Sequence, residues 1–177
     1  MFEFRPRTLL IQVVAALSAL AAAGVAAAQN SIALEAATAQ VAVGQPFAVD
    51  LNANFSTASV GGAVALVYDP ALLSLDSVAF TAGDADFQCP GSLVISCPAD
   101  PNYLSWGDVA GFSGATGVAT LTFTPLDTGI ISIGLQSADA FGAVGGGLVP
   151  MTLEGTSVTR DGAGIPSLSP WGGAFLI

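Results

Sequence analysis

The chain lacks most of the side chains that catalysis uses. Among its 177 residues there is no histidine and no lysine, and three basic residues stand against 13 acidic ones. This composition excludes a Ser-His-Asp triad, a Cys-His dyad, a Schiff-base lysine and a histidine metal site. So few cations cannot neutralise phosphates, which argues against nucleic acid and anionic lipid as partners. We expect partners that are neutral or basic, or that are held through divalent cations.

The N-terminus predicts export. Arg5 and Arg7 precede an apolar run over 8–28, which ends in three alanines that suit a small-residue cleavage site. We therefore interpret residues 1–28 as a secretory signal peptide cut after Ala28. An uncleaved membrane anchor is the alternative, but the run is rich in alanine instead of leucine. Once it is removed, Arg160 is the only cation, and the net charge is −11.

Cysteine is scarce as well, with Cys89 and Cys97 as the only two. In an oxidising exported setting we expect them to form one local disulfide. Closing so short a loop would stabilise the fold by roughly 2–3 kcal/mol. Free thiols or metal ligands are the alternative, but a zinc site would need further cysteines or histidines.

The rest of the chain predicts one all-β domain over residues 30–159. Short alternating runs are separated by Gly, Pro, Asn and Asp, and no stretch sustains a helical period. Phe47, Val49 and Leu51 alternate with Asp50 and Asn52, so we expect the apolar set to face inward. The glycine clusters at 61–62 and 145–147 predict turns or bulges. The expected strands are 32–37, 40–43, 47–54, 62–68, 73–80, 103–108, 117–124, 129–137 and 149–160.

Two segments resemble the cohesin family, which is structurally related to carbohydrate-binding modules. They are VGQPFAVDL at 43–51 and ALVYDPALLSL at 65–75, and the later pair GVATLTF at 117–123 and GIISI at 129–133 is also similar. The resemblance implies an antiparallel jelly-roll β-sandwich of about nine strands without a catalytic role. It further implies a surface that binds a protein partner, usually a dockerin, or a polysaccharide. Tyr68 and Asp69 within it suit a structural turn.

The long segment 81–114 holds the candidate binding aromatics, because long loops on a rigid scaffold often carry recognition. They are Tyr103, Trp106 and Phe112. On one strand, a spacing of three places Tyr103 and Trp106 on opposite faces, so they form no flat platform for a sugar without a bulge. We expect one of the two to be in the core and favour Trp106.

The same segment concentrates carboxylates at Asp84, Asp86, Asp100 and Asp108. Two carboxylates across a cleft could hydrolyse glycosides, but solvated loop acids are the interpretation that we favour. Asp84 and Asp86 could also bind calcium, although they lack the regular spacing of a calcium loop.

The C-terminus carries a sorting-signal pattern after a Gly-rich linker at 160–164. Residues 165–172 resemble the IPTL-CTERM signal, a relative of PEP-CTERM signals that a sorting protease of the exosortase type processes; they are Ile165, Pro166, Ser167, Leu168, Ser169, Pro170, Trp171 and Gly172. The family's membrane span and basic tail do not follow within 165–177, so the anchor is truncated or lost. A Pro-rich tail that merely contains a tryptophan is the alternative.

Together these features predict an exported, non-catalytic binding module at the cell surface, in the periplasm or outside the cell. The alternative from a different class is a structural component of an extracellular matrix or biofilm.

Overall fold

The computed structural model describes residues 29–92 and 94–161 as nine strands and one short 3-10 helix. The expected signal peptide and the expected sorting motif fall outside these residues. In the described part, no helix is long and apolar enough to cross a bilayer. The elements are β1 (Ser31–Ala36), β2 (Gln40–Ala42), β3 (Phe47–Val67), β4 (Leu73–Phe80), η1 (Ala85–Phe87), β5 (Tyr103–Pro125), β6 (Gly129–Ala143), β7 (Leu148–Val149), β8 (Thr152–Glu154) and β9 (Thr156–Asp161).

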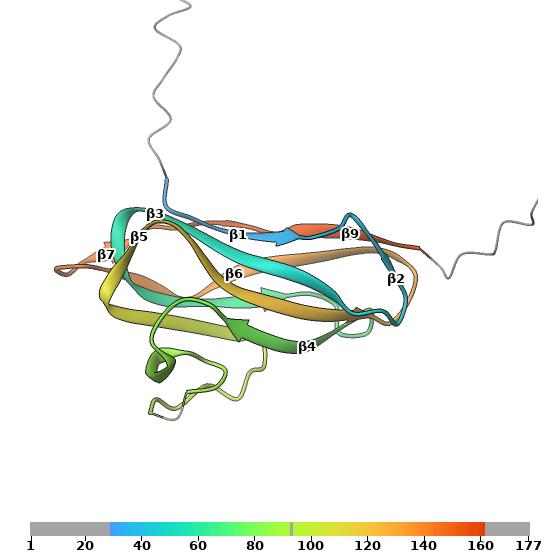
Figure 1. Ribbon diagram of the computed structural model, residues 1–177, viewed down its shortest axis with the longest axis horizontal. Helices are drawn as coiled ribbons and strands as arrows, with labels where there is room; N and C mark the ends of the chain where they lie inside the picture. The colour runs from blue at the N-terminus through green and yellow to red at the C-terminus, as the bar shows by residue number, and fades with distance from the viewer. Residues whose placement is uncertain (1–28, 93, 162–177) are drawn as a thin grey trace, which may run out of the picture.

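The strands form a β-sandwich in which β3 and β5 run through both layers (Figure 1). The first half of β3 pairs with β1 and with the second half of β5, to which β4 adds an edge. The second half of β3 pairs with the first half of β5 and with β6, and β6 pairs with β9. Register shifts near Phe55, Ser59 and Gly61 let the paired strands curl from one layer to the other.

Most strand pairs are antiparallel, as the sequence predicted, and two are parallel. β1 pairs with β8 and β2 pairs with β9 in the parallel direction. Both pairings join the start of the domain to its end. β9 also continues through Arg160 to Asp161, where the sequence predicted the beginning of a linker.

The core lies between the layers and confirms the inward set that the alternation predicted. Phe47, Val49 and Leu51 are buried, whereas Asp50 faces solvent. Further core residues come from every long strand; they include Ile32, Phe55, Val64, Leu66, Leu104, Trp106, Leu121, Phe123, Ile131, Ile133 and Phe141. Burial of this apolar surface is the main favourable term in folding.

Polar groups close the end of the sandwich near the Tyr-Asp-Pro turn. Asp69 accepts a hydrogen bond from the amide of Ala71 at 2.9 Å, so its role in the turn is structural, as expected. Arg160 is only 4% exposed and donates to the carbonyl oxygens of Leu72 and Gly129, each at 3.2 Å. Arg160, the single cation of the described residues, therefore ties β9 to the turn before β4 and to the start of β6.

Candidate functional site

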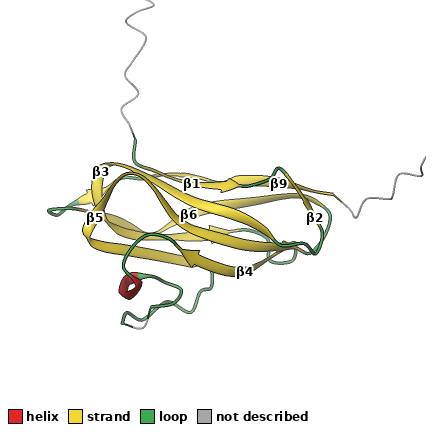
Figure 2. Ribbon diagram, in the orientation of Figure 1, coloured by secondary structure: helices red, strands yellow, loops and turns green. Residues whose placement is uncertain are grey.

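A long loop packs on the outer side of the layer formed by β6, β3 and the first half of β5. This disulfide loop, residues 81–102, lies with its one helical turn outside the strand layers (Figure 2). The amides of Cys89 and Ser105 each donate to the other residue's carbonyl oxygen at 2.9 Å, and the amide of Asp84 donates to the Gly107 carbonyl at 2.8 Å. These backbone bonds attach the loop to β5 at two points.

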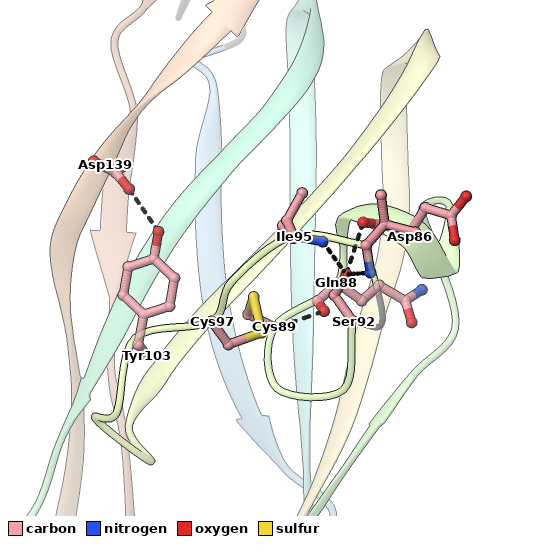
Figure 3. Close-up of a disulfide and its surroundings, with 9 residues drawn as sticks. Asp86, Gln88, Cys89, Ser92, Ile95, Cys97, Tyr103 and Asp139 are labelled. Carbon is pink, nitrogen blue, oxygen red and sulfur yellow. Dashed lines mark hydrogen bonds between the residues drawn. A yellow bond between two sulfur atoms is a disulfide. The ribbon is translucent and has the colours of Figure 1, made fainter.

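Cys89 and Cys97 form the predicted disulfide, with an S–S distance of 2.14 Å. Cys89 is buried against β5, so the disulfide also holds Cys97 and the chain beside it near the sheet. Between the two cysteines, the Ser92 hydroxyl donates to the Asp86 carbonyl at 2.8 Å and accepts from the amide of Ile95 at 3.0 Å. Figure 3 shows how these bonds and the bridge fix Ile95 on the side of the loop that faces Tyr103.

A glycine in β5 gives the loop its close approach to the sheet. A Cβ added to Gly107 would lie 3.4 Å from the Cβ of Phe87 and 3.2 Å from the carbonyl oxygen of Val60. Phe87 in η1 thus lies over a position where β5 has no side chain. The Asp84 side chain caps η1 by accepting from the amide of Asp86 at 3.1 Å.

Opposite the loop, a tyrosine and an aspartate join β5 to β6 across β3. The Tyr103 hydroxyl donates to Asp139 Oδ2 at 2.5 Å. Ala63 of β3 pairs with Asp139 on one side and with Ser105 on the other, and it is buried although it lies outside the central core cluster. Its small side chain leaves room for the bridge above it. Desolvation and the hydrogen bond to Asp139 raise the pKa of Tyr103 to about 12.

Between the loop and this bridge lies an open cleft of about 500 Å³. Its walls combine apolar side chains of the loop and of the strands with two carboxylates, Asp108 and Asp139. The full lining is Val60, Gly62, Phe87, Ile95, Tyr103, Ser105, Trp106, Gly107, Asp108, Val109 and Asp139. This volume falls in the range of ligand-binding clefts, and its few polar groups lie among apolar walls.

The structure separates the three predicted binding aromatics. Trp106 is 1% exposed and packs against the Phe141 ring with a centroid distance of 5.4 Å, whereas Tyr103 faces the cleft. Phe112 is also buried and stacks on Phe55. Trp106 and Phe112 therefore offer no exposed ring for sugar stacking, and Tyr103 is the one aromatic of the three with its side chain at the surface.

Three of the four loop carboxylates accept hydrogen bonds from backbone amides of their own turns. Asp84 accepts from the amide of Asp86, Asp100 accepts from Asn102 at 2.9 Å, and Asp108 accepts from Ala110 at 2.8 Å. Only Asp108 of the four lines the cleft. In the described residues, no group of three or more His, Cys, Asp or Glu side chains is arranged to hold a metal ion. The Asp84 and Asp86 calcium site therefore stays a prediction.

Solved structures of similar shape are cohesin modules. The cohesin module of a family 33 glycoside hydrolase from Clostridium perfringens aligns with a TM-score of 0.59 at 15% identity, over 76% of this chain and 98% of that module. The fold is cohesin-like. A non-cellulosomal cohesin from the archaeon Archaeoglobus fulgidus gives a TM-score of 0.53 at 16% identity, over 76% of this chain and 92% of that one.

A cohesin from a type I cohesin–dockerin complex of Clostridium thermocellum gives a TM-score of 0.55 at 14% identity, over 75% of this chain and 100% of that one. No protein-family model matches the chain, and no curated protein matches it in sequence. The likeness thus confirms the cohesin-like sandwich that the sequence motifs predicted.

Within this cohesin-like fold, the sequence did not reveal most of the cleft. Asp139 lies in the middle of a strand, and no local pattern indicates that Tyr103 reaches it from 36 residues away. Val60 and Val109 lie just outside the expected strands, and Phe87 and Ile95 were expected in a loop. These four side chains line one cleft because the disulfide loop packs back against β5.

Proposed function

We propose that this chain is a non-catalytic module that binds a protein partner through the cleft between the disulfide loop and β5. The observation that supports this function most directly is an apolar cleft on the outer face of a cohesin-like sandwich. Three of its wall residues, Val60, Phe87 and Val109, are exposed apolar side chains, and Val109 is 80% exposed. Exposed apolar groups that gather around a cleft are typical of interaction sites.

Similar structures support a protein as the ligand. Three of the cohesins that resemble this chain were solved with dockerins, from Clostridium thermocellum, in a complex named CaDoc0917–CaCohA2, and from Acetivibrio cellulolyticus. The buried rings of Trp106 and Phe112 argue against a sugar-stacking platform. A dockerin-like protein is therefore the partner that we propose, in preference to a polysaccharide.

The test is a binding panel on the full exported chain. Recombinant dockerins would be titrated by calorimetry with calcium present, beside a glycan array. We expect a dockerin to bind, and Val109→Asn to weaken it by at least about tenfold, or 1.4 kcal/mol. Ile130→Asn is the matched control, because Ile130 is 71% exposed but does not line the cleft. Binding of glycans alone, or dockerin binding that ignores Val109→Asn, would overturn the proposal.

We further propose that the chain is exported and displayed at the cell surface. The disulfide fits an oxidising compartment outside the cytoplasm. The expected signal peptide at 1–28 and the sorting pattern at 165–172 would supply the route. Mass spectrometry of the protein from its native cell would test this route by locating both ends; a mature chain that begins at residue 29 is the expected result, and an intact N-terminus would contradict it.

A further inference from the structure

We propose that the segment of the partner that enters the cleft carries an arginine or lysine next to an apolar side chain. This inference rests on the proposed function, since it names the chemistry of the partner of that same cleft.

Two carboxylates mark where a positive charge would bind. Asp139 Oδ2 accepts from the Tyr103 hydroxyl, and Asp108 Oδ1 accepts from the amide of Ala110. Among the described residues, the second oxygen of each carboxylate has no protein partner. Both side chains line the cleft beside apolar walls, and a charge-assisted hydrogen bond is about twice as strong as a neutral one.

The described residues cannot supply the opposite charge themselves. Within 29–92 and 94–161 the only basic side chain is Arg160, which is buried and donates to backbone carbonyl oxygens at the end of the sandwich. Twelve carboxylates against this one guanidinium give residues 29–161 a net charge of −11. Once the expected signal peptide at 1–28 is removed with Arg5 and Arg7, a positive group at Asp108 and Asp139 must come from the partner, and the field of the domain favours its approach.

The walls require an apolar side chain beside that positive group. Phe87 and Ile95 of the disulfide loop face the cleft from one side, and Val60 and Val109 of the sheet line it as well. A lone ammonium or guanidinium group would leave these apolar surfaces in contact with water. A side chain such as leucine or phenylalanine would remove them from water and add the hydrophobic contribution to binding.

The test uses a random peptide library displayed on phage and selected on the immobilised full chain. We expect enrichment of peptides in which arginine or lysine is adjacent to an aliphatic or aromatic residue. A synthetic peptide of the enriched sequence should bind wild type, and the double variant D108N/D139N should weaken it by at least about tenfold. Asparagine keeps an oxygen that can accept the bond from Tyr103, which limits the change to charge.

The matched control is D50N/D76N, which removes the same charge from the other layer. There, Asp50 and Asp76 accept from the hydroxyls of Thr120 and Thr124. Equal weakening by both double variants, or enrichment of neutral or acidic peptides in the cleft, would overturn the inference while the proposed function stands. If the library yields no peptide whose binding Val109→Asn weakens by at least about tenfold, the result counts against both the inference and the proposed function.

Discussion

At the scale of single residues, the bridge between Tyr103 and Asp139 defines one wall of the cleft. Its hydrogen bond passes over Ala63 and joins the outer strands β5 and β6. Desolvation and this bond raise the pKa of Tyr103 to about 12 from the ordinary value of 10.0. Desolvation, with a smaller contribution from Asp100, also raises the pKa of Tyr68.

We predict that Tyr103 stays largely protonated at pH 10.0, the ordinary tyrosine pKa, and that Tyr68 ionises less there than a free tyrosine does. A raised folded-state pKa means that its stabilising contribution is complete below the unfolded pKa of about 10 and is lost as the pH rises toward 12. The ultraviolet absorbance of tyrosinate would follow the titration, and urea unfolding would follow the stability. Tyr103→Phe should remove the titration step near pH 12 and leave that of Tyr68. Ordinary titration of Tyr103 near pH 10 would show that the bridge to Asp139 does not form.

Gly61 permits another close approach, between the second half of β3 and β5. Its φ is +118°, and a Cβ there would collide with the carbonyl oxygen of Trp106. We predict that Gly61→Ala is severely destabilising, since it adds a backbone clash to an unfavourable φ that alone costs about 1–3 kcal/mol. Urea unfolding would measure the loss.

Gly91 is a matched control, because its φ is +117° and a Cβ there would meet nothing within 4 Å. Gly91→Ala should therefore lower the free energy of unfolding only by the cost of its unfavourable φ. Equal losses in the two variants would show that the contact with Trp106 adds no energy of its own.

At the scale of elements, the disulfide loop gives the cleft its second wall. The bridge closes a short segment of chain between Cys89 and Cys97, and backbone bonds to Ser105 attach it to β5. Ile95 lies between the two cysteines and faces Tyr103 (Figure 3). The position of this apolar wall thus depends on a covalent link that is remote from the core.

We predict that the double variant Cys89→Ser, Cys97→Ser loosens the loop and leaves the sandwich folded. The free energy of unfolding should fall by about 2–3 kcal/mol, since the unfolded chain regains the entropy that the bridge removed. Hydrogen exchange should accelerate at the amide of Ser105, which donates to residue 89, while the amides between β1 and β3 stay protected. Unchanged exchange at Ser105 would show that the loop holds its place without the disulfide.

The long strands show how far the sequence predicts the elements. Strands 47–54 and 62–68 were expected as separate elements, but they are parts of one strand, β3. The alternation of inward residues breaks between Phe55 and Gly61, where the register with β5 shifts. The Gly61 cluster is thus a bulge, one of the two interpretations that its glycines favoured, and the 145–147 cluster is a turn. A bulge and a turn disturb the alternation in the same way, so the local sequence cannot separate them.

At the scale of the whole molecule, the charged side chains that face solvent are all of one sign among the described residues. Because Arg160 is buried on carbonyl oxygens, the described residues present acidic side chains to solvent without basic ones among them. Added salt therefore has repulsion to screen, and no surface ion pairs to weaken. We predict that the urea midpoint at neutral pH rises as the ionic strength increases toward about 0.15 M, where the Debye length is about 8 Å. A midpoint that falls with salt would show that attractive charge pairs stabilise the domain.

At this scale, the sequence predicts the type of fold but not the complete strand topology or the cleft. The Tyr-Asp-Pro segment and the alternating strands indicated the cohesin-like sandwich, because those signals are local. The parallel pairs of β1 with β8 and β2 with β9 join segments more than a hundred residues apart, and no local pattern specifies them. The cleft likewise depends on Asp139 of β6 and Val60 of β3, which meet the disulfide loop only once the layers have formed.

The central claim is that a protein partner occupies the cleft. The most direct test replaces Val109 with a photo-crosslinking amino acid in the full chain, expressed in its native cell, with Ile130 replaced in the control. We predict that light yields one covalent adduct with a protein at position 109 and none at position 130. The purified adduct partner should then bind wild type and lose affinity for Val109→Asn. Equal crosslinking at both positions, or none at position 109, would contradict the account.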